Sequence, residues 1–182
     1  MADSVSKVFD PDEPRDENGR WTVSASQSGP ANRALRAKAV GRDVEIDYAD
    51  GTTETRSGGT PAWRNNNPGN IECSTAAMSY GAIGCAGGFV VFPDEATGTQ
   101  AMQSLLHSSK YAPLTLDAAI ARWAPPKENN TARYQALVQQ WTGLSGSSVI
   151  GTLSADQLTS VIGAIKRMEG WQVGTVRRTT SL

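Results

Sequence analysis

The feature that most constrains the fold of this 182-residue chain is a periodic apolar pattern close to its C-terminal end. Over residues 158–165, apolar side chains recur at spacings of three and four, which is the period of one buried helix face. Residues 154–157, Ser-Ala-Asp-Gln, have the form of a capping box just in front of this pattern. The sequence therefore predicts an amphipathic helix that begins at Ser154 and runs to Glu169.

Glu169 continues the apolar face of this predicted helix by one further turn, so its carboxyl lies on or beside the buried face. Burial disfavours the ionised form and raises the pKa of a carboxyl, and the partial negative charge of a helix C-terminus acts in the same direction. A carboxyl that stays protonated near neutral pH is suited to protonate a glycosidic oxygen. Two other interpretations stay open: Glu169 turns out to solvent, or it pairs with an arginine such as Arg64.

The rest of the chain is divided by turn residues and by changes of period. Alternating apolar residues predict a β-hairpin over residues 43–56, with Asp50-Gly51 as a two-residue turn. A short apolar strand is predicted at 89–92. Three more helical patterns follow: one capped by Asp94 or Thr97, one from Thr115 to Pro125-Pro126, and one over residues 130–142.

These elements predict a mainly α (α+β) fold: a helical domain with a short strand and hairpin element and an extended N-terminal segment. We expect four divisions, of which the third carries all the functional motifs. They are a disordered or attachment segment at 1–42, a hairpin and linker at 43–60, a functional domain at 61–171, and a C-terminal tail at 172–182.

Composition excludes several classes of function. The formal net charge of −1 gives no general basic field for nucleic acid, and no run of about 18 apolar residues is present to insert into a membrane. The first residues have neither the basic start nor the apolar core of a secretory signal, so we expect cytoplasmic synthesis without a signal peptide. Two cysteines and the single His107 are not a zinc-ligand set, and we expect no metal and no cofactor.

Cys73 and Cys85 lie close together among glycines and small residues. Two states are open from the sequence: free thiols in a reducing compartment, or a disulfide that closes a short loop in an oxidising one. The surrounding glycines make close approach feasible. We predict that the two cysteines pair when the protein meets an oxidising space.

Two polar segments could hold a ligand. Residues 64–70, Arg-Asn-Asn-Asn-Pro-Gly-Asn, carry amides that both donate and accept hydrogen bonds and so match sugar hydroxyl and acetamido groups. At the corner 123–134, two prolines end one helix and Asn129, Asn130 or Thr131 caps the next, with Tyr134 one turn in. Each segment has an ordinary structural interpretation as well, as a polar turn and as a helix corner with Tyr134 in the core.

Taken together and in order, four segments resemble a domain of phage virion proteins and secreted antibacterial effectors. They are Arg-Asn-Asn-Asn-Pro-Gly-Asn-Ile at 64–71, Gly-Phe-Val-Val-Phe at 88–92, the corner at 123–134, and Glu-Gly at 169–170. The segments are more loosely similar to the lysozyme superfamily of muramidases and lytic transglycosylases. In that superfamily the helix with the catalytic glutamate comes first, so the resemblance implies a circularly permuted arrangement over residues 61–171.

The resemblance implies cleavage of the β-1,4 glycosidic bond of peptidoglycan, with Glu169 as general acid and Glu128 as the alternative acid. It also implies that sugar is bound by Arg64, Asn65, Asn67, Asn70, Asn129, Thr131 and Tyr134. No motif places a second carboxylate, which favours a one-acid scheme in which the sugar's own 6-hydroxyl attacks, while hydrolysis by water stays open.

The implied partner is the peptidoglycan glycan strand. Residues 14–21, Pro-Arg-Asp-Glu-Asn-Gly-Arg-Trp, resemble an element at the edges of phage head proteins, so residues 1–42 are a candidate for attachment to virion proteins. We expect a protein that is virion-associated or delivered to the periplasm. The competing interpretation is a non-catalytic virion structural or wall-binding module of the same fold.

Overall fold

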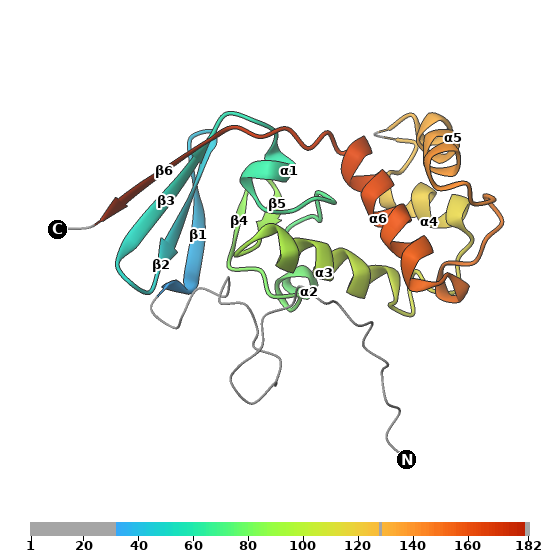
Figure 1. Cartoon of the computed structure of the whole chain (residues 1–182), viewed down its shortest axis with the longest axis horizontal. Coiled ribbons are helices and arrows are strands. Elements are labelled where there is room, and N and C mark those ends of the chain that lie inside the picture. The colour runs from blue at the N-terminus through green and yellow to red at the C-terminus, as the bar shows by residue number, and fades with distance from the viewer. Residues whose placement is uncertain (1–31, 128, 181–182) are drawn as a thin grey trace, which may run out of the picture.

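The computed structural model describes residues 32–127 and 129–180 (Figure 1), so Glu128 and the segment 14–21 lie outside the described residues. The strands are β1 (Ala34–Val40), β2 (Asp43–Tyr48), β3 (Thr52–Ser57), β4 (Gly84–Ala86), β5 (Phe89–Val91) and β6 (Thr175–Thr180). The helices are α1 (Pro61–Arg64), α2 (Thr75–Met78), α3 (Glu95–Leu106), α4 (Leu116–Trp123), α5 (Thr131–Thr142) and α6 (Ala155–Met168), with a 3-10 turn at Ile150–Thr152.

The strands form one six-stranded mixed sheet in the order β5-β4-β1-β2-β3-β6. β1 pairs with β4 in parallel, and the other neighbouring strands pair antiparallel. The prediction of a mainly helical fold is therefore wrong: the protein is α+β with a prominent sheet. The prediction was wrong because β1 joins the hairpin to the β4–β5 pair in one sheet, whereas the sequence patterns predicted only a separate hairpin and one short strand.

The hairpin predicted over residues 43–56 is present as β2 and β3, with Val44 and Ile46 buried. Its turn is longer than predicted. The amide of Gly51 donates to the carbonyl of Tyr48 at 3.1 Å, and Gly51 has a φ of 80°. This is a three-residue loop, a type I turn followed by a left-handed glycine, rather than a two-residue turn.

Three strands lie in segments for which no strand was predicted: β1 in the expected disordered or attachment segment, β4 just before the predicted strand at 89–92, and β6 in the expected tail. Most of β1 and all of β6 are exposed, so neither shows the alternation of a half-buried strand. β6 pairs along its whole length with β3, from Thr175 opposite Ser57 to Thr180 opposite Thr52. Backbone hydrogen bonds rather than apolar burial hold β1 and β6. Residues 34–57 therefore belong to the same sheet as β4 and β5, which lie in the expected functional domain.

The helical predictions are confirmed. In α6 the stripe Leu158, Val161, Ile162 and Ile165 is buried, and both hydrogen bonds of the capping box at Ser154 are present. Asp94, Thr115 and Asn130 cap α3, α4 and α5. Figure 1 shows α4, α5 and α6 at one end of the molecule and β1–β3 with β6 at the other, with α3, β4 and β5 between them.

An extended segment carries the chain from the end of α6 to β6. It is held against the start of α1 by two hydrogen bonds between Thr60 and Gln172. The Thr60 amide donates to the Gln172 carbonyl at 3.1 Å, and the Gln172 amide donates to Oγ1 of Thr60 at 3.1 Å. The end of α6 is therefore tied to the sheet within three residues of Glu169.

A buried ion cluster joins β3, β6 and α1. Glu54 is only 5% exposed and accepts from Nη1 of Arg56 at 3.0 Å and from Nη2 of Arg178 at 2.9 Å. The Arg56 guanidinium also donates to the carbonyl of Trp63 at 2.8 Å and lies 4.3 Å from the centre of its ring. The charges of Glu54 and Arg56 are buried and are stable only because each has its partners, whereas the Arg178 side chain is 53% exposed.

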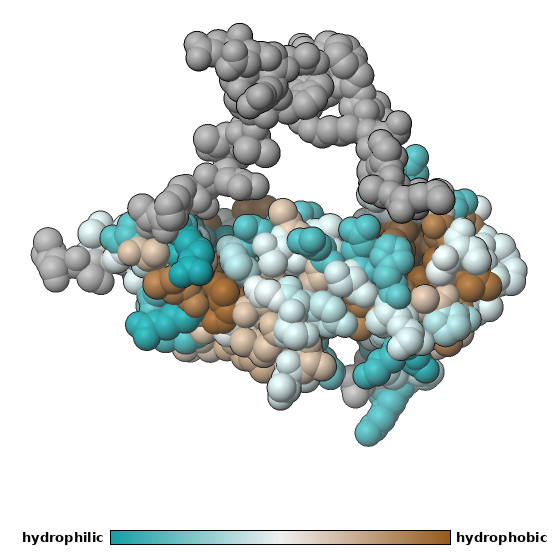
Figure 2. All heavy atoms as spheres, turned by 90° about the horizontal axis from the view of Figure 1, so that it is seen from below, coloured by the Kyte–Doolittle hydropathy of each residue, from teal (hydrophilic) through white to brown (hydrophobic). Residues whose placement is uncertain are grey.

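The surface is mixed in polarity. In the part of the chain that the structure describes, no helix has the length and apolar character needed to cross a bilayer. On the face shown in Figure 2, apolar residues form separate patches among polar ones. Such scattered apolar exposure is ordinary and assigns no function to this face.

The substitution Glu54→Gln is expected to destabilise the fold by about 3–5 kcal/mol, because it leaves the buried Arg56 without its carboxylate. Thermal and urea unfolding measure this effect. The matched control is Glu45→Gln on β2, whose pair with the exposed Lys38 is worth about 0–1 kcal/mol. Equal losses in the two variants would contradict a structural role for the cluster.

Candidate active site

The three consecutive asparagines after α1 are buried and bind backbone rather than solvent. Nδ2 of Asn65 donates to the carbonyl of Ala86 at 3.0 Å, and the amide of Asn66 reaches two carbonyls just after β5. Asn67 both accepts from the amide of Ile71 and donates to its carbonyl, each at 2.9 Å. These bonds satisfy backbone groups that the short strands leave unpaired, and they fix the path of the loop that leads to Asn70.

Asn70 has a left-handed backbone with a φ of 46°, a conformation that asparagine tolerates better than most residues. The preceding Gly69 is equally constrained, since a Cβ there would lie 2.6 Å from the ring of Trp123. Nε1 of Trp123 donates to the Gly69 carbonyl at 3.2 Å. The α4 tryptophan therefore packs directly on the loop and holds Asn70 in place.

Glu169 is the C-cap of α6, and its amide donates to the carbonyl of Ile165 at 2.9 Å. Gly170 follows in the left-handed conformation, with a φ of 73°, and ends the helix. Oε2 of Glu169 accepts from Nδ2 of Asn70 at 2.9 Å, and Oε1 accepts from the hydroxyl of Tyr134 at 3.0 Å. Three residues from separate predicted motifs thus meet at one carboxyl.

The environment favours the protonated form of this carboxyl. Burial raises the pKa of Glu169, and the hydrogen bonds from Asn70 and Tyr134 offset only part of that effect. Burial and the neighbouring carboxyl also raise the pKa of Tyr134, so its phenol remains a donor. Oδ1 of Asn70 is buried without a hydrogen-bond partner among the described residues. Turning this amide over would present Oδ1 to a protonated Glu169, so the pair serves both ionisation states.

Glu169 and Asn70 lie in the wall of a groove of about 910 Å³, which is large enough for a substantial ligand. The lining comes from the loop after α1, from α2, and from Tyr111 and Trp123. The rings of Tyr111 and Trp123 have centres 5.9 Å apart in an edge-to-face arrangement. A half-buried acid therefore faces an open groove with aromatic lining.

The predicted site residues fall into two groups. Glu169, Asn70 and Tyr134 are in direct contact, and Asn129 lines the same groove. Glu128, the alternative acid, lies outside the described residues.

Arg64, Asn65, Asn67 and Thr131 do not line the groove. Nη1 of Arg64 donates to two carbonyls of the Gly58-Gly59 turn, and Oγ1 of Thr131 donates to the carbonyl of Ala124 at 2.6 Å. The structure thus uses these four polar side chains inside the fold rather than in the groove. Asn and Thr side chains bond readily to backbone groups, and the sequence held no signal to separate this use from sugar binding.

Several groove residues were absent from the predicted set. Trp123 belonged to the corner motif and could have been named from it. Glu72 follows the Asn-rich loop directly, yet its position in the groove depends on how the loop turns. Lys110, Tyr111 and Arg122 line the groove as well, and nothing in their local pattern indicated this.

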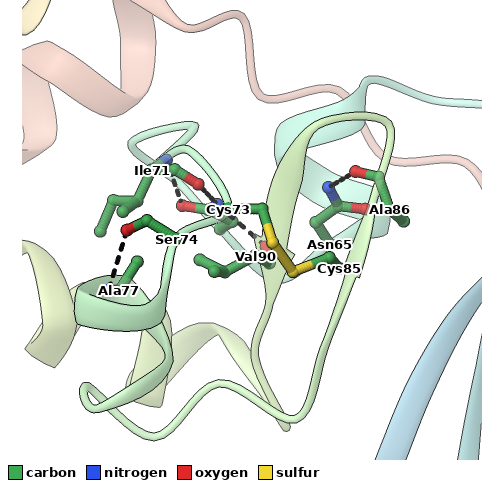
Figure 3. The surroundings of a disulfide bond; sticks show 9 residues. Asn65, Ile71, Cys73, Ser74, Ala77, Cys85, Ala86 and Val90 are labelled. Carbon is green, nitrogen blue, oxygen red and sulfur yellow. Dashed lines mark hydrogen bonds between the residues drawn. A yellow bond between two sulfur atoms is a disulfide. The ribbon is translucent and has the colours of Figure 1, made fainter.

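Cys73 and Cys85 form a disulfide, with Cα atoms 5.9 Å apart (Figure 3). This is the second of the two states that the sequence left open. The bond joins the segment before α2 to β4. The chain between the two cysteines contributes Ser74, Ala76, Ala77 and Tyr80 to the groove, so the disulfide restrains one of its walls.

A scan against models of protein families finds no match for this chain, and a search of curated proteins finds none either. Among the described residues, no three His, Cys, Asp or Glu side chains are grouped to hold a metal ion. The side chains of the groove therefore define the chemistry that this site can perform.

The substitution Asn70→Gly is expected to raise the pKa of Glu169 further, because the lost amide donor stabilised the ionised form. Glycine adopts the left-handed backbone without strain, so the loop should keep its path. Carbon-13 NMR titration of the glutamate carboxyls measures the shift. The control Asn129→Gly alters a groove asparagine that makes no hydrogen bond to Glu169, and an equal shift there would refute the specific role of Asn70.

Reduction of the Cys73–Cys85 bond is expected to lower the free energy of unfolding by about 3 kcal/mol, the chain-entropy value for a loop of this size. Urea unfolding with and without dithiothreitol measures the difference. A variant in which both cysteines are replaced by serine is the control and should not respond to reductant. Unchanged stability of the natural protein on reduction would contradict the prediction.

Proposed function

We propose that this protein cleaves the β-1,4 glycosidic bond of peptidoglycan glycan strands, with Glu169 as the general acid. One observation carries the proposal: a half-buried carboxyl with a raised pKa, oriented by Asn70 and Tyr134, lies in the wall of an open groove. General acids for glycosidic oxygens are carboxyls of this kind, kept protonated near neutral pH by their surroundings.

In the proposed reaction, Glu169 donates its proton to the bridging oxygen while the bond between C1 of the muramyl sugar and that oxygen breaks. The departing sugar leaves as an alcohol. The Glu169 carboxylate then takes the proton of the muramyl 6-hydroxyl, whose oxygen bonds to C1 and closes a 1,6-anhydro ring. Attack by water in place of the 6-hydroxyl gives hydrolysis from the same first step.

The groove supports a glycan as the ligand class. Trp123 and Tyr111 give the groove an aromatic lining, which suits the apolar face of a sugar ring. Asn129 adds an uncharged amide that can match hydroxyl and acetamido groups. Asn70 is already bonded to the acid, so its part is to orient Glu169 rather than to hold sugar directly.

The proposal takes its support from the site and from the four motif segments, not from the sheet-rich fold. The disulfide agrees with work in an oxidising space, where peptidoglycan lies outside the inner membrane. Attachment to a virion or delivery to the periplasm is part of the same proposal. A wall-binding module without turnover is the alternative outcome of the following test.

The substitution Glu169→Gln is expected to reduce glycan cleavage by a factor of about 10²–10⁴, because glutamine keeps the size but has no proton to give. The measurement is release of soluble fragments from purified peptidoglycan, with mass spectrometry to distinguish anhydro from hydrated ends. Glu128→Gln is the parallel variant and should slow turnover less. An active Glu169→Gln beside a dead Glu128→Gln would move the acid to the corner after α4, and a natural protein without turnover would leave the wall-binding module.

The pH dependence of the melting temperature tests the raised pKa of Glu169. Burial raises the pKa of Glu169 in the folded protein above its value in the unfolded chain. The contribution of Glu169 to the free energy of unfolding is therefore complete below the unfolded pKa and is lost as pH rises through the folded pKa. Glutamine stays neutral throughout. The melting temperature of Glu169→Gln should therefore rise relative to the natural protein with increasing pH, and cleavage by the natural protein should fall over the same range.

A further inference from the structure

The groove contains two cations that the proposed reaction does not use, Lys110 and Arg122. Both side chains are exposed, and no carboxylate of a described residue lies within ion-pair distance of either. Among the described residues, the carboxylates that line the groove are Glu72 and Glu169. Glu72 lies two residues after Asn70, and Glu169 accepts a hydrogen bond from Asn70.

A chain of contacts connects Glu169 to these two cations. Glu169 bonds to Asn70 at 2.9 Å, and the adjoining Gly69 carbonyl accepts from Trp123 at 3.2 Å. The Trp123 ring meets the Tyr111 ring, and the guanidinium of Arg122 lies 5.7 Å from the centre of that ring. The rings of Trp123 and Tyr111 thus link the loop that bonds to Glu169 with the guanidinium of Arg122.

Arg122 is oriented before any ligand arrives. Its guanidinium lies over Tyr111, and Nη1 donates to the backbone carbonyl of Lys110, which brings the two cationic residues together. Further N–H donors of the guanidinium fork remain for a carboxylate. A side chain already held in this way loses less conformational entropy when it binds an anion.

We propose that Lys110 and Arg122 form a subsite for the carboxylates of the stem peptide, so that the protein selects peptide-bearing glycan over neutral glycan. This inference rests on the proposed function. The acetamido sugars of a glycan backbone are themselves uncharged, and in peptidoglycan the stem peptides on the muramyl residues carry most of the carboxylates. A pair of cations in a groove that also binds sugar is matched to that combination of groups.

The test measures binding to Glu169→Gln protein by isothermal titration, so that turnover does not interfere. Three ligands are compared: a disaccharide with its tetrapeptide stem, the same disaccharide with only its lactyl carboxylate, and neutral di-N-acetylchitobiose. Replacing both cations, Lys110→Gln with Arg122→Gln, should weaken binding of the peptide-bearing ligand relative to chitobiose by a factor of about 10–100. Added salt should reduce the same preference.

The matched control is Lys127→Gln with Arg133→Gln, which removes the same charge from exposed residues that do not line the groove. It should leave the preference among the three ligands unchanged. Equal weakening for all three ligands, or no weakening, would overturn the inference. Equal weakening for the two muramyl ligands would also overturn it, because one carboxylate on the lactyl arm would then serve as well as a stem peptide. Failure of the proposed function shows separately, as absence of cleavage by the natural protein.

Discussion

The hydrogen bond between Asn70 and Glu169 joins residues 99 positions apart and is the contact on which the candidate site depends. One partner ends a loop pinned by buried asparagines, and the other ends α6, the longest described helix. Tyr134 meets the second oxygen from α5. A donor on each oxygen fixes the orientation of the carboxyl, as the proposed proton transfer requires.

Both sides of this contact are held by structure outside the groove. Asn67 and the Cys73–Cys85 disulfide tie the loop side to β4 and β5. On the other side, the chain leaving α6 bonds to Thr60 and then enters β6, which pairs with the hairpin. The sheet therefore bears on the placement of Glu169, although none of the residues of β1–β3 or β6 lines the groove.

The elements predicted well from the sequence are those whose buried apolar residues recur with a regular period. The stripe of α6 and the alternation of Val44 and Ile46 are of this kind. β1 and β6 were missed because they are exposed and held by backbone bonds, which leave no trace in side-chain pattern. The parallel contact of Ala37 with Gly84 is non-local and has no signal in either segment.

The candidate site shows the same division. Three separate motifs indicated Asn70, Tyr134 and Glu169, and these three residues meet. The motif could not say which asparagines serve the fold, because Asn65 and Asn67 offer the same amide as Asn70. The role of each asparagine depends on whether its amide faces a backbone carbonyl or the end of α6. Only the tertiary arrangement decides this.

The spacing within the groove has an electrostatic consequence. A cation beside Glu169 would favour its ionised form and lower the pKa of the carboxyl, which would defeat a proton donor. Burial and two neutral hydrogen-bond donors set the pKa of Glu169, and neither Lys110 nor Arg122 contributes to it. In the proposed function, Lys110 and Arg122 can therefore attract an anionic ligand without opposing the raised pKa of Glu169.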